Sequence, residues 1–155
     1  MTAIELLDAL QKFIEEKTKD IVLREKGKEG LERAAKVFKM RLPNKDAETK
    51  FIPYILLQFL TGKDGDAASS SESECKIRIV VVTYSEDGSE GAMDVLNLLT
   101  RIRIALLENG LIDERFLVKK PLEYIVYPDD TDPYYLGEMV VTFEMPTIER
   151  RWQNG

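Results

Sequence analysis

Carboxylates are the most numerous side chains here that could do chemistry, because the chain has no histidine and one cysteine. Asp64 and Asp66 form one acidic run, and Asp129, Asp130 and Asp132 form another. Clustered carboxylate oxygens are ligands that calcium prefers. Neither run has the ligand count or the glycine placement of an EF-hand loop. We therefore expect no metal site.

Catalysis lacks the residues that it needs. A serine nucleophile would have no histidine partner, and Cys75 follows an acidic serine-rich run with no cation that would favour its thiolate. The glycines at 88 and 91 span a segment too short and too acidic to cradle a phosphate. The carboxylates fall in loops, where solvent leaves their pKa ordinary. We expect no enzyme activity and no cofactor.

Length and charge suit one soluble domain over residues 1–155. The net charge of −6 argues against general nucleic-acid binding, which depends on neutralising phosphates. The opening residues lack the pattern of a signal peptide, and no apolar run is long enough to cross a bilayer. A lone cysteine forms no internal disulfide. A protein that stays in the cytoplasm, with no membrane contact, is expected.

The charge is unevenly distributed along the chain. Residues 17–50 hold 11 Lys/Arg and 6 Asp/Glu, a balance of +5, so the remainder carries −6 − 5 = −11. Such asymmetry could orient one copy against the next, basic face to acidic face, in a head-to-tail ring. The plainer interpretation is two unrelated solvated faces.

The first 50 residues predict one helix and two extended segments. Thr2 and Glu5 fit a capping box, and the apolar positions that follow at helical spacing are Ile4, Leu7, Leu10 and Ile14. A short strand is expected at 21–24, a flexible turn at 26–30, and an extended segment at 35–42 that Pro43 ends.

The middle of the chain predicts two buried strands joined by a long loop. Residues 51–60 are almost continuously apolar, with Pro53 near the start, and residues 76–83 alternate with one fully apolar face. Between them, residues 62–74 are rich in Gly, Ala, Ser and acidic residues, which predicts a mobile loop. One hypothesis makes this loop an arm that a partner orders.

A long helix is expected to begin with Ser89 as its cap and to end at Asn109-Gly110. Its apolar face consists of Ala92, Val95, Leu96, Leu99, Ile102 and Leu106. Its polar stripe consists of Glu90, Asp94, Asn97, Arg101 and Glu108. Such stripes are mostly just solvated.

The last third predicts two strands and a tail. Residues 116–127 are extended and interrupted by Pro121, residues 129–133 form a turn, and residues 135–145 alternate as a strand. The tail at 147–155 is expected to be peripheral. This order of elements predicts an α+β fold in which two helices pack on a mostly antiparallel or mixed sheet, a sandwich of ferredoxin-like type. The connection from 82 to 117 would be a right-handed crossover if its two strands are parallel in one sheet.

Five ordered motifs together resemble the tail terminator, or tail completion, proteins of long-tailed phages and prophages of Gram-positive bacteria. They lie at 53–58 (PYILLQ), 80–87 (VVVTYSED), 94–109 (DVLNLLTRIRIALLEN), 121–124 (PLEY) and 134–147 (YYLGE to MPT). The resemblance covers roughly 42–150. It implies a small α+β protein that forms a hexameric ring on the finished tail tube, stops tube polymerisation and presents a surface for head joining.

Under that resemblance the partners are further copies of the chain, the tail tube protein and a head-tail connector protein. The protein would be found in the host cytoplasm during assembly and then at the tail-neck junction of the virion. Two alternatives stay open: another neck component of the particle, and a ferredoxin-like module that binds a small effector between subunits. The candidate interface residues are Asp64, Asp66, Glu72, Glu74, Asp94, Asn97 and Arg101.

Overall fold

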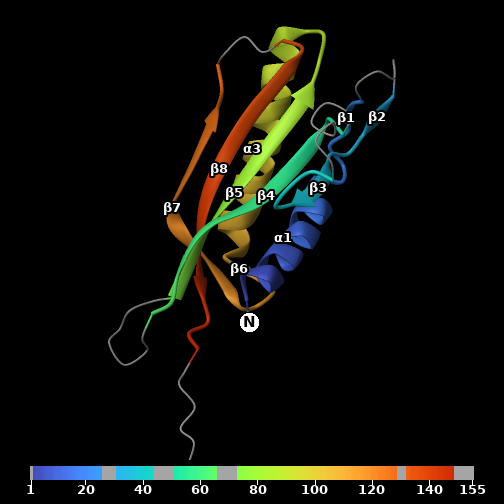
Figure 1. Cartoon of the computed structure of the whole chain (residues 1–155). Coiled ribbons are helices and arrows are strands. Elements are labelled where there is room, and N and C mark those ends of the chain that lie inside the picture. The colour runs from blue at the N-terminus through green and yellow to red at the C-terminus, as the bar shows by residue number, and fades with distance from the viewer. Residues whose placement is uncertain (1, 26–30, 44–50, 66–72, 129–131, 149–155) are drawn as a thin grey trace, which may run out of the picture.

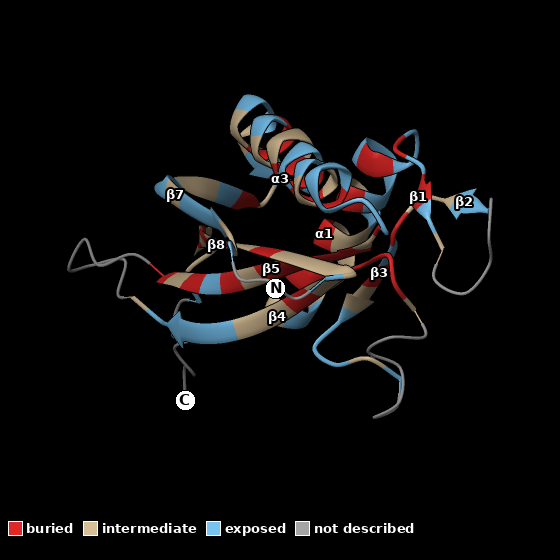
Figure 2. Ribbon diagram, turned by 90° about the horizontal axis from the view of Figure 1, so that it is seen from above, coloured by how far each residue is buried: buried red, intermediate tan, exposed pale blue. Residues whose placement is uncertain are grey.

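The computed structural model describes residues 2–25, 31–43, 51–65, 73–128 and 132–148. Two helices lie on one face of a six-stranded sheet, and no described helix covers the other face (Figures 1 and 2). The elements are α1 (Ala3–Thr18), β1 (Leu23–Arg24), β2 (Glu32–Arg33), β3 (Lys36–Lys39), β4 (Tyr54–Lys63), β5 (Ser73–Tyr84), α3 (Gly88–Asn109), β6 (Leu111–Ile112), β7 (Phe116–Val126) and β8 (Tyr134–Met145).

The strand order in the sheet is β3-β4-β5-β8-β7-β6, and β1 pairs only with β2. β3 is parallel to β4, whereas every other neighbouring pair is antiparallel. The predicted α+β class with a mixed sheet and two helices is confirmed for the described residues; the ferredoxin-like arrangement is not. β5 and β7 are both antiparallel to β8, so the connection through α3 joins two parallel strands, which is the condition set above for a right-handed crossover.

α1 begins as predicted, because the Thr2 hydroxyl accepts a hydrogen bond from the Glu5 backbone N–H at 3.2 Å. Its buried face consists of Leu6, Leu7, Leu10, Ile14 and Thr18. Ile4 is 71% exposed, so its expected place on the apolar face was wrong.

α3 differs from the prediction at its start and on its buried face. Its cap is Asp87 and not Ser89, since the Asp87 carboxylate accepts from the N–H groups of Ser89 (3.0 Å) and Glu90 (3.2 Å). Leu98 is fully buried, whereas Leu96 faces solvent. The predicted end is correct, because Gly110 takes φ 75° and its N–H bonds to the Leu106 carbonyl.

The loop predicted at 62–74 is shorter, because both flanking strands extend into it. Gly62 pairs with Cys75 and Lys63 with Glu74 in the β4–β5 ladder. Backbone hydrogen bonds thus order residues that have little apolar surface to bury. Residues 66–72 lie outside the described chain, and so do the predicted turn at 26–30, most of the turn at 129–133 and most of the tail at 147–155.

Pro53 and Pro121 affect the start of β4 and the middle of β7, as the sequence predicted. Pro53 follows a cis peptide bond directly before β4, where its missing N–H removes no ladder bond. Pro121 lies within β7, whose register against β8 shifts between Lys119 and Glu123. The expected interruption of this strand is therefore a bulge.

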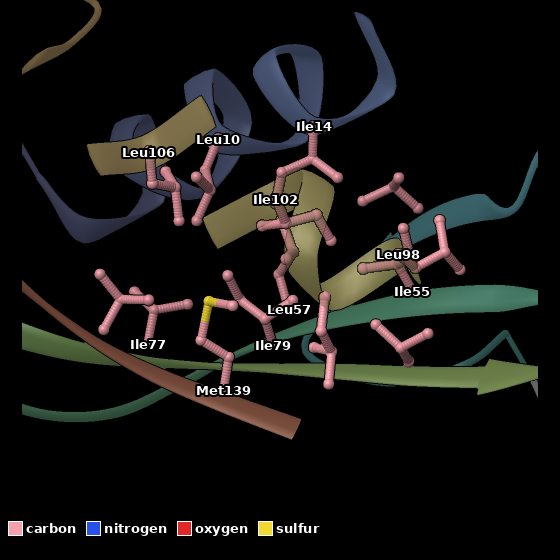
Figure 3. Close-up of a cluster of buried hydrophobic side chains, with 14 of the residues drawn as sticks. Leu10, Ile14, Ile55, Leu57, Ile77, Ile79, Leu98, Ile102, Leu106 and Met139 are labelled. Carbon is pink, nitrogen blue, oxygen red and sulfur yellow. The ribbon is translucent and has the colours of Figure 1, made fainter. Parts of the chain in front are cut away.

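The main core fills the space between the helices and the sheet. α1 contributes Leu10 and Ile14, α3 contributes Leu98 and Ile102, and strands below present Ile55, Leu57, Ile77, Ile79 and Met139 (Figure 3). A second cluster lies on the opposite sheet face, where Ile52, Tyr54, Val80 and Val82 are buried. β4 and β5 are therefore covered on both faces at this end, as continuous apolar runs predict.

Two glycines set how closely α3 approaches β8. A Cβ on Gly91 would lie 2.2 Å from the Tyr135 ring. A Cβ on Gly137 of β8 would lie 2.6 Å from Val95 and 2.8 Å from Leu99, both on α3. No real Cβ tolerates such contacts, so any side chain here forces helix and sheet apart.

We expect Gly137→Ala to lower the free energy of unfolding by about 1–3 kcal/mol, because the added methyl overpacks the α3–β8 contact. Gly88→Ala is the matched control, since its Cβ would approach only the Tyr135 hydroxyl, at 3.2 Å. Urea denaturation followed by circular dichroism measures both. Equal stability of Gly137→Ala and the parent protein would contradict this account of the packing.

Candidate assembly surface

The seven predicted interface residues do not form one site. Glu74 lies at the start of β5, and Asp64 is exposed just after β4. Asp94, Asn97 and Arg101 lie on α3, which begins beyond the other end of β5. Strand β5 has 12 residues, about 40 Å at 3.3 Å per residue. Asp66 and Glu72 lie outside the described residues.

Arg101 already has partners within the molecule. Its guanidinium donates to the Asp20 carboxylate at 2.7 Å and to the Lys17 carbonyl at 3.1 Å, which ties α3 to the end of α1. The hydrogen bond from Arg101 lowers the pKa of Asp20. Substituting Arg101 would therefore break a contact within one copy, so it is a poor probe of an interface between copies.

Asp94 and Glu74 also have local roles. Burial, then repulsion from Glu90, raises the pKa of Asp94, while attraction from Arg24 acts against that rise. This helix face thus lies toward the β1–β2 ribbon. Glu74 accepts from Lys119 of β7 at 2.9 Å, and this bond lowers its pKa. Asn97 is exposed.

The helix-free face of the sheet holds a polar network at its centre. Arg78 donates to Glu138 and, at 2.9 Å, to Gln58, while Tyr127 donates to Glu138. Burial alone would raise the pKa of Glu138, but the bonds from Tyr127 and Arg78 outweigh it and lower that pKa. Each carboxylate oxygen of Glu138 accepts one of these hydrogen bonds, so the group links β5, β8 and the end of β7.

Neither metal binding nor thiol chemistry has a centre among the described residues. No group of three His, Cys, Asp or Glu side chains could hold a metal ion there. Cys75 is buried, and burial followed by the Glu74 charge raises its thiol pKa to about 11. A thiol with that pKa is not a nucleophile at neutral pH. No described helix is long and apolar enough to cross a membrane.

An exposed apolar stripe on α3 was missed by the sequence analysis. Met93 is 60% exposed, Ile104 42% and Leu96 39%, and all three lie on the helix side that faces away from the sheet. Spacings of three and eight residues place them on one side of the helix. The signal was present: α3 has more apolar residues than one buried face can hold. The buried set alone already takes Val95, Leu98, Leu99, Ile102, Ala105 and Leu106.

The strand β7, which contacts α3, has an unpaired length. β6 pairs only with Phe116 and Leu117, so no described strand pairs with the outer edge of residues 122–126. Tyr127 N–H bonds to Leu136 O on β8. Because antiparallel pairs alternate, Tyr124 and Val126 direct their backbone N–H and C=O groups away from β8. An unpaired edge of this kind is a template for another strand.

Side chains join the edge to the helix. Tyr124 is 44% exposed and Ile125 48%. The Arg103 guanidinium of α3 lies 5.4 Å from the Tyr124 ring centroid, and its Nε is buried with no hydrogen-bond partner among the described residues. We call this set the β7–α3 surface: residues 122–126 with Met93, Leu96, Arg103 and Ile104. Exposed apolar groups beside an open sheet edge are typical of an assembly surface.

No model of a known protein family matches the chain, and no curated protein matches it.

Truncating Leu96 and Leu98 of α3 should show, by the loss of stability, which leucine is exposed in the stripe and which is buried in the core. We expect Leu98→Ala to lower the free energy of unfolding by about 2–5 kcal/mol, because it empties a buried site. Leu96→Ala should cost within about 0.5 kcal/mol, as surface changes do. Both follow from urea titrations. Similar losses in the two variants would place Leu96 in the core after all.

The Glu74–Lys119 ion pair gives a pH-dependent signal. The bond from Lys119 favours the charged carboxylate, so Glu74 should titrate below its ordinary pKa of 4.5. The contact stabilises the protein above that lowered pKa and is lost as pH falls through it. Carboxyl carbon shifts in an NMR titration report the midpoint. In Lys119→Met the midpoint should move up toward 4.5; an unmoved midpoint would assign the shift to another cause.

Proposed function

We propose that this chain is a tail terminator of a long-tailed phage or prophage. It caps the finished tail tube as a ring of six copies, stops polymerisation of the tube and offers the surface to which the head joins. Its partners are further copies of itself, the tail tube protein and a head-tail connector protein. It works in the host cytoplasm during assembly and then stays at the tail-neck junction of the virion.

The β7–α3 surface is the observation that carries this proposal. A monomer that stays alone blunts its sheet edges and scatters its exposed apolar residues. Here an unpaired strand edge carries two half-exposed residues, and α3, whose Arg103 stacks on that edge, carries an exposed apolar stripe. Such a surface suits a protein whose task is to bind other proteins, and a ring needs one on every copy.

The placement of the five motifs adds support. They fall at the start of β4, at the end of β5, along α3, at the bulge of β7 and along β8. β4, β5, β8 and β7 are consecutive neighbours in the sheet, and α3 packs on them. The resemblance therefore concerns one connected unit. Under this proposal the fold is a ferredoxin-like sandwich of tail-terminator type.

Deleting the gene from an inducible host and examining particles by electron microscopy tests the proposal. Without a cap, tube subunits keep adding, so we expect overlong tails without heads. Purified protein added to the extract should restore tail length and head attachment. The Arg101→Lys protein is the control. Its lysine can still bond to Asp20, so the variant should restore tail length and head attachment as the parent protein does.

Two other outcomes would replace the proposal. Tails of normal length beside unjoined heads would make the protein another neck component. Wholly normal particles would favour the regulatory module, whose dimer should gain thermal stability with a bound metabolite.

A further inference from the structure

The opposite edge of the sheet provides a surface that matches the β7–α3 surface. Three rows of paired residues run across all five strands, so Val37, Phe38 and Lys39 of β3 each have a counterpart on β7. One such row is Phe38–Leu56–Val80–Glu138–Ile125, and its neighbours begin at Val37 and Lys39 and end at Val126 and Tyr124. The two edges therefore lie level with each other on opposite sides of one molecule.

β3 directs alternate backbone groups outward. Lys36 N–H bonds to Pro53 O and Met40 N–H to Leu57 O, both toward β4. Val37 and Lys39 between them thus face away from the sheet. Their carbonyls are occupied, by Gln11 Nε2 at 2.8 Å and by Arg41 N at 2.8 Å. Their outward N–H groups have no acceptor among the described residues.

A hollow of about 460 Å³ adjoins this edge between α1 and β3. Its apolar lining comes from Ala34, Ala35, Val37 and Phe38, and the charged residues in its lining are Glu15, Lys19 and Lys36. The hollow lies on the same edge as the outward N–H groups. It can take a large side chain from a strand that pairs there.

We infer that β7 of a second copy adds to the β3 edge, so that one sheet continues from copy to copy. β7 is antiparallel to β3 within one molecule. A neighbour in the same orientation therefore presents an antiparallel strand. Its Val126 meets Val37 and its Tyr124 meets Lys39, which brings the outward N–H groups of Val37 and Lys39 opposite carbonyl acceptors on β7 without any shift of register. The occupied carbonyls of Val37 and Lys39 each keep a second lone pair for the N–H groups of the added strand.

Side chains on both sheet faces agree with this register. Ile125 of one copy lies opposite Phe38 of the next, on the helix-free face. On the helix face, Val126 lies opposite Val37 in the lining of the hollow, and Tyr124, with Arg103 stacked over it, lies opposite Lys39. The Arg103 guanidinium is then level with the Lys39–Asp8 ion pair of the next copy, in which Asp8 is the residue of opposite charge.

The two surfaces differ, so the contact is head-to-tail, and repetition of a head-to-tail contact closes a ring when the rotation permits. The inference rests on the proposed function insofar as that ring is the tail cap. The contact itself can be measured on pure protein without tubes. Failure of the inference and failure of the tail assay are thus separate results.

Disulfide trapping tests the register. Ile125 and Phe38 form a non-hydrogen-bonded pair, in which Cα atoms lie about 4.5 Å apart, within the reach of a disulfide. We expect Ile125→Cys mixed with Phe38→Cys to give, under mild oxidation, a reducible dimer at twice the 17.8 kDa monomer mass. The native Cys75 is buried and should not react.

Two controls accompany the mixture. Ile125→Cys with Met40→Cys places the thiols two residues out of register and should give at least fivefold less dimer. Ile125→Cys alone should stay monomeric on a non-reducing gel. Strong self-linking of Ile125→Cys alone would mean that β7 pairs with β7 about a two-fold axis, and would overturn the inference.

Charge exchange gives a second test that spares Phe38, whose removal weakens the packing around Tyr54. Arg103→Glu places two carboxylates in the contact, and Asp8→Arg places two guanidiniums there. Each variant alone should show at least a tenfold loss of self-association by light scattering after size exclusion. An equal mixture should assemble again, because every contact in an alternating ring then joins opposite charges.

Parent-like assembly of both single variants would overturn the inference, and so would a mixture as weak as its components. Circular dichroism confirms that each variant is folded before mixing. If the parent protein assembles and neither test succeeds, the ring uses other surfaces. The proposed function is then still decided by the tail lengths seen in the electron microscope.

Discussion

The closeness of α3 to β8 governs the rest of this structure. Gly91 leaves room for the Tyr135 ring, and Gly137 leaves room for Val95 and Leu99, so helix and strand meet with no side chain to hold them apart. This contact brings Leu98 and Ile102 over the centre of the sheet, where α1 completes the core (Figure 3). Because α3 packs on the sheet along this side, its opposite side is exposed to solvent. The apolar stripe of Met93, Leu96 and Ile104 follows from that geometry.

A sheet with both helices on one face has two different sides (Figure 2). The helix side is dry and closely packed. The other side divides into an apolar cluster around Tyr54 and Val82 and a charged network around Glu138. The network is satisfied by neighbouring strands, so it holds them in register.

The two edges are finished differently. On β3, side chain Gln11 and the Arg41 backbone occupy the outward carbonyls. On β7, the bulge at Pro121 separates a stretch that β6 covers from a stretch that no described strand covers. Bulges and prolines commonly limit pairing at sheet edges. Here the bulge limits it to one half of the strand, and the open half is the one on which Arg103 of α3 stacks.

Local signals in the sequence determined the elements: the Thr2 cap, the Gly110 stop, the alternation in β5 and β8, and the interruption at Pro121 all depend on near neighbours. They also determined the α+β class. The choice of Asp87 over Ser89 was also local, since Asp87 bonds to residues two and three positions on. The ion pairs of Arg101 and Glu74, by contrast, depended on partners 81 and 45 residues away, and the choice of Leu98 over Leu96 depended on which side of α3 is buried. Helical spacing cannot tell which of two apolar faces meets the sheet, because both satisfy the same period. Only the tertiary structure decided that, since only there do β7 and α3 lie side by side with their outer surfaces unpaired.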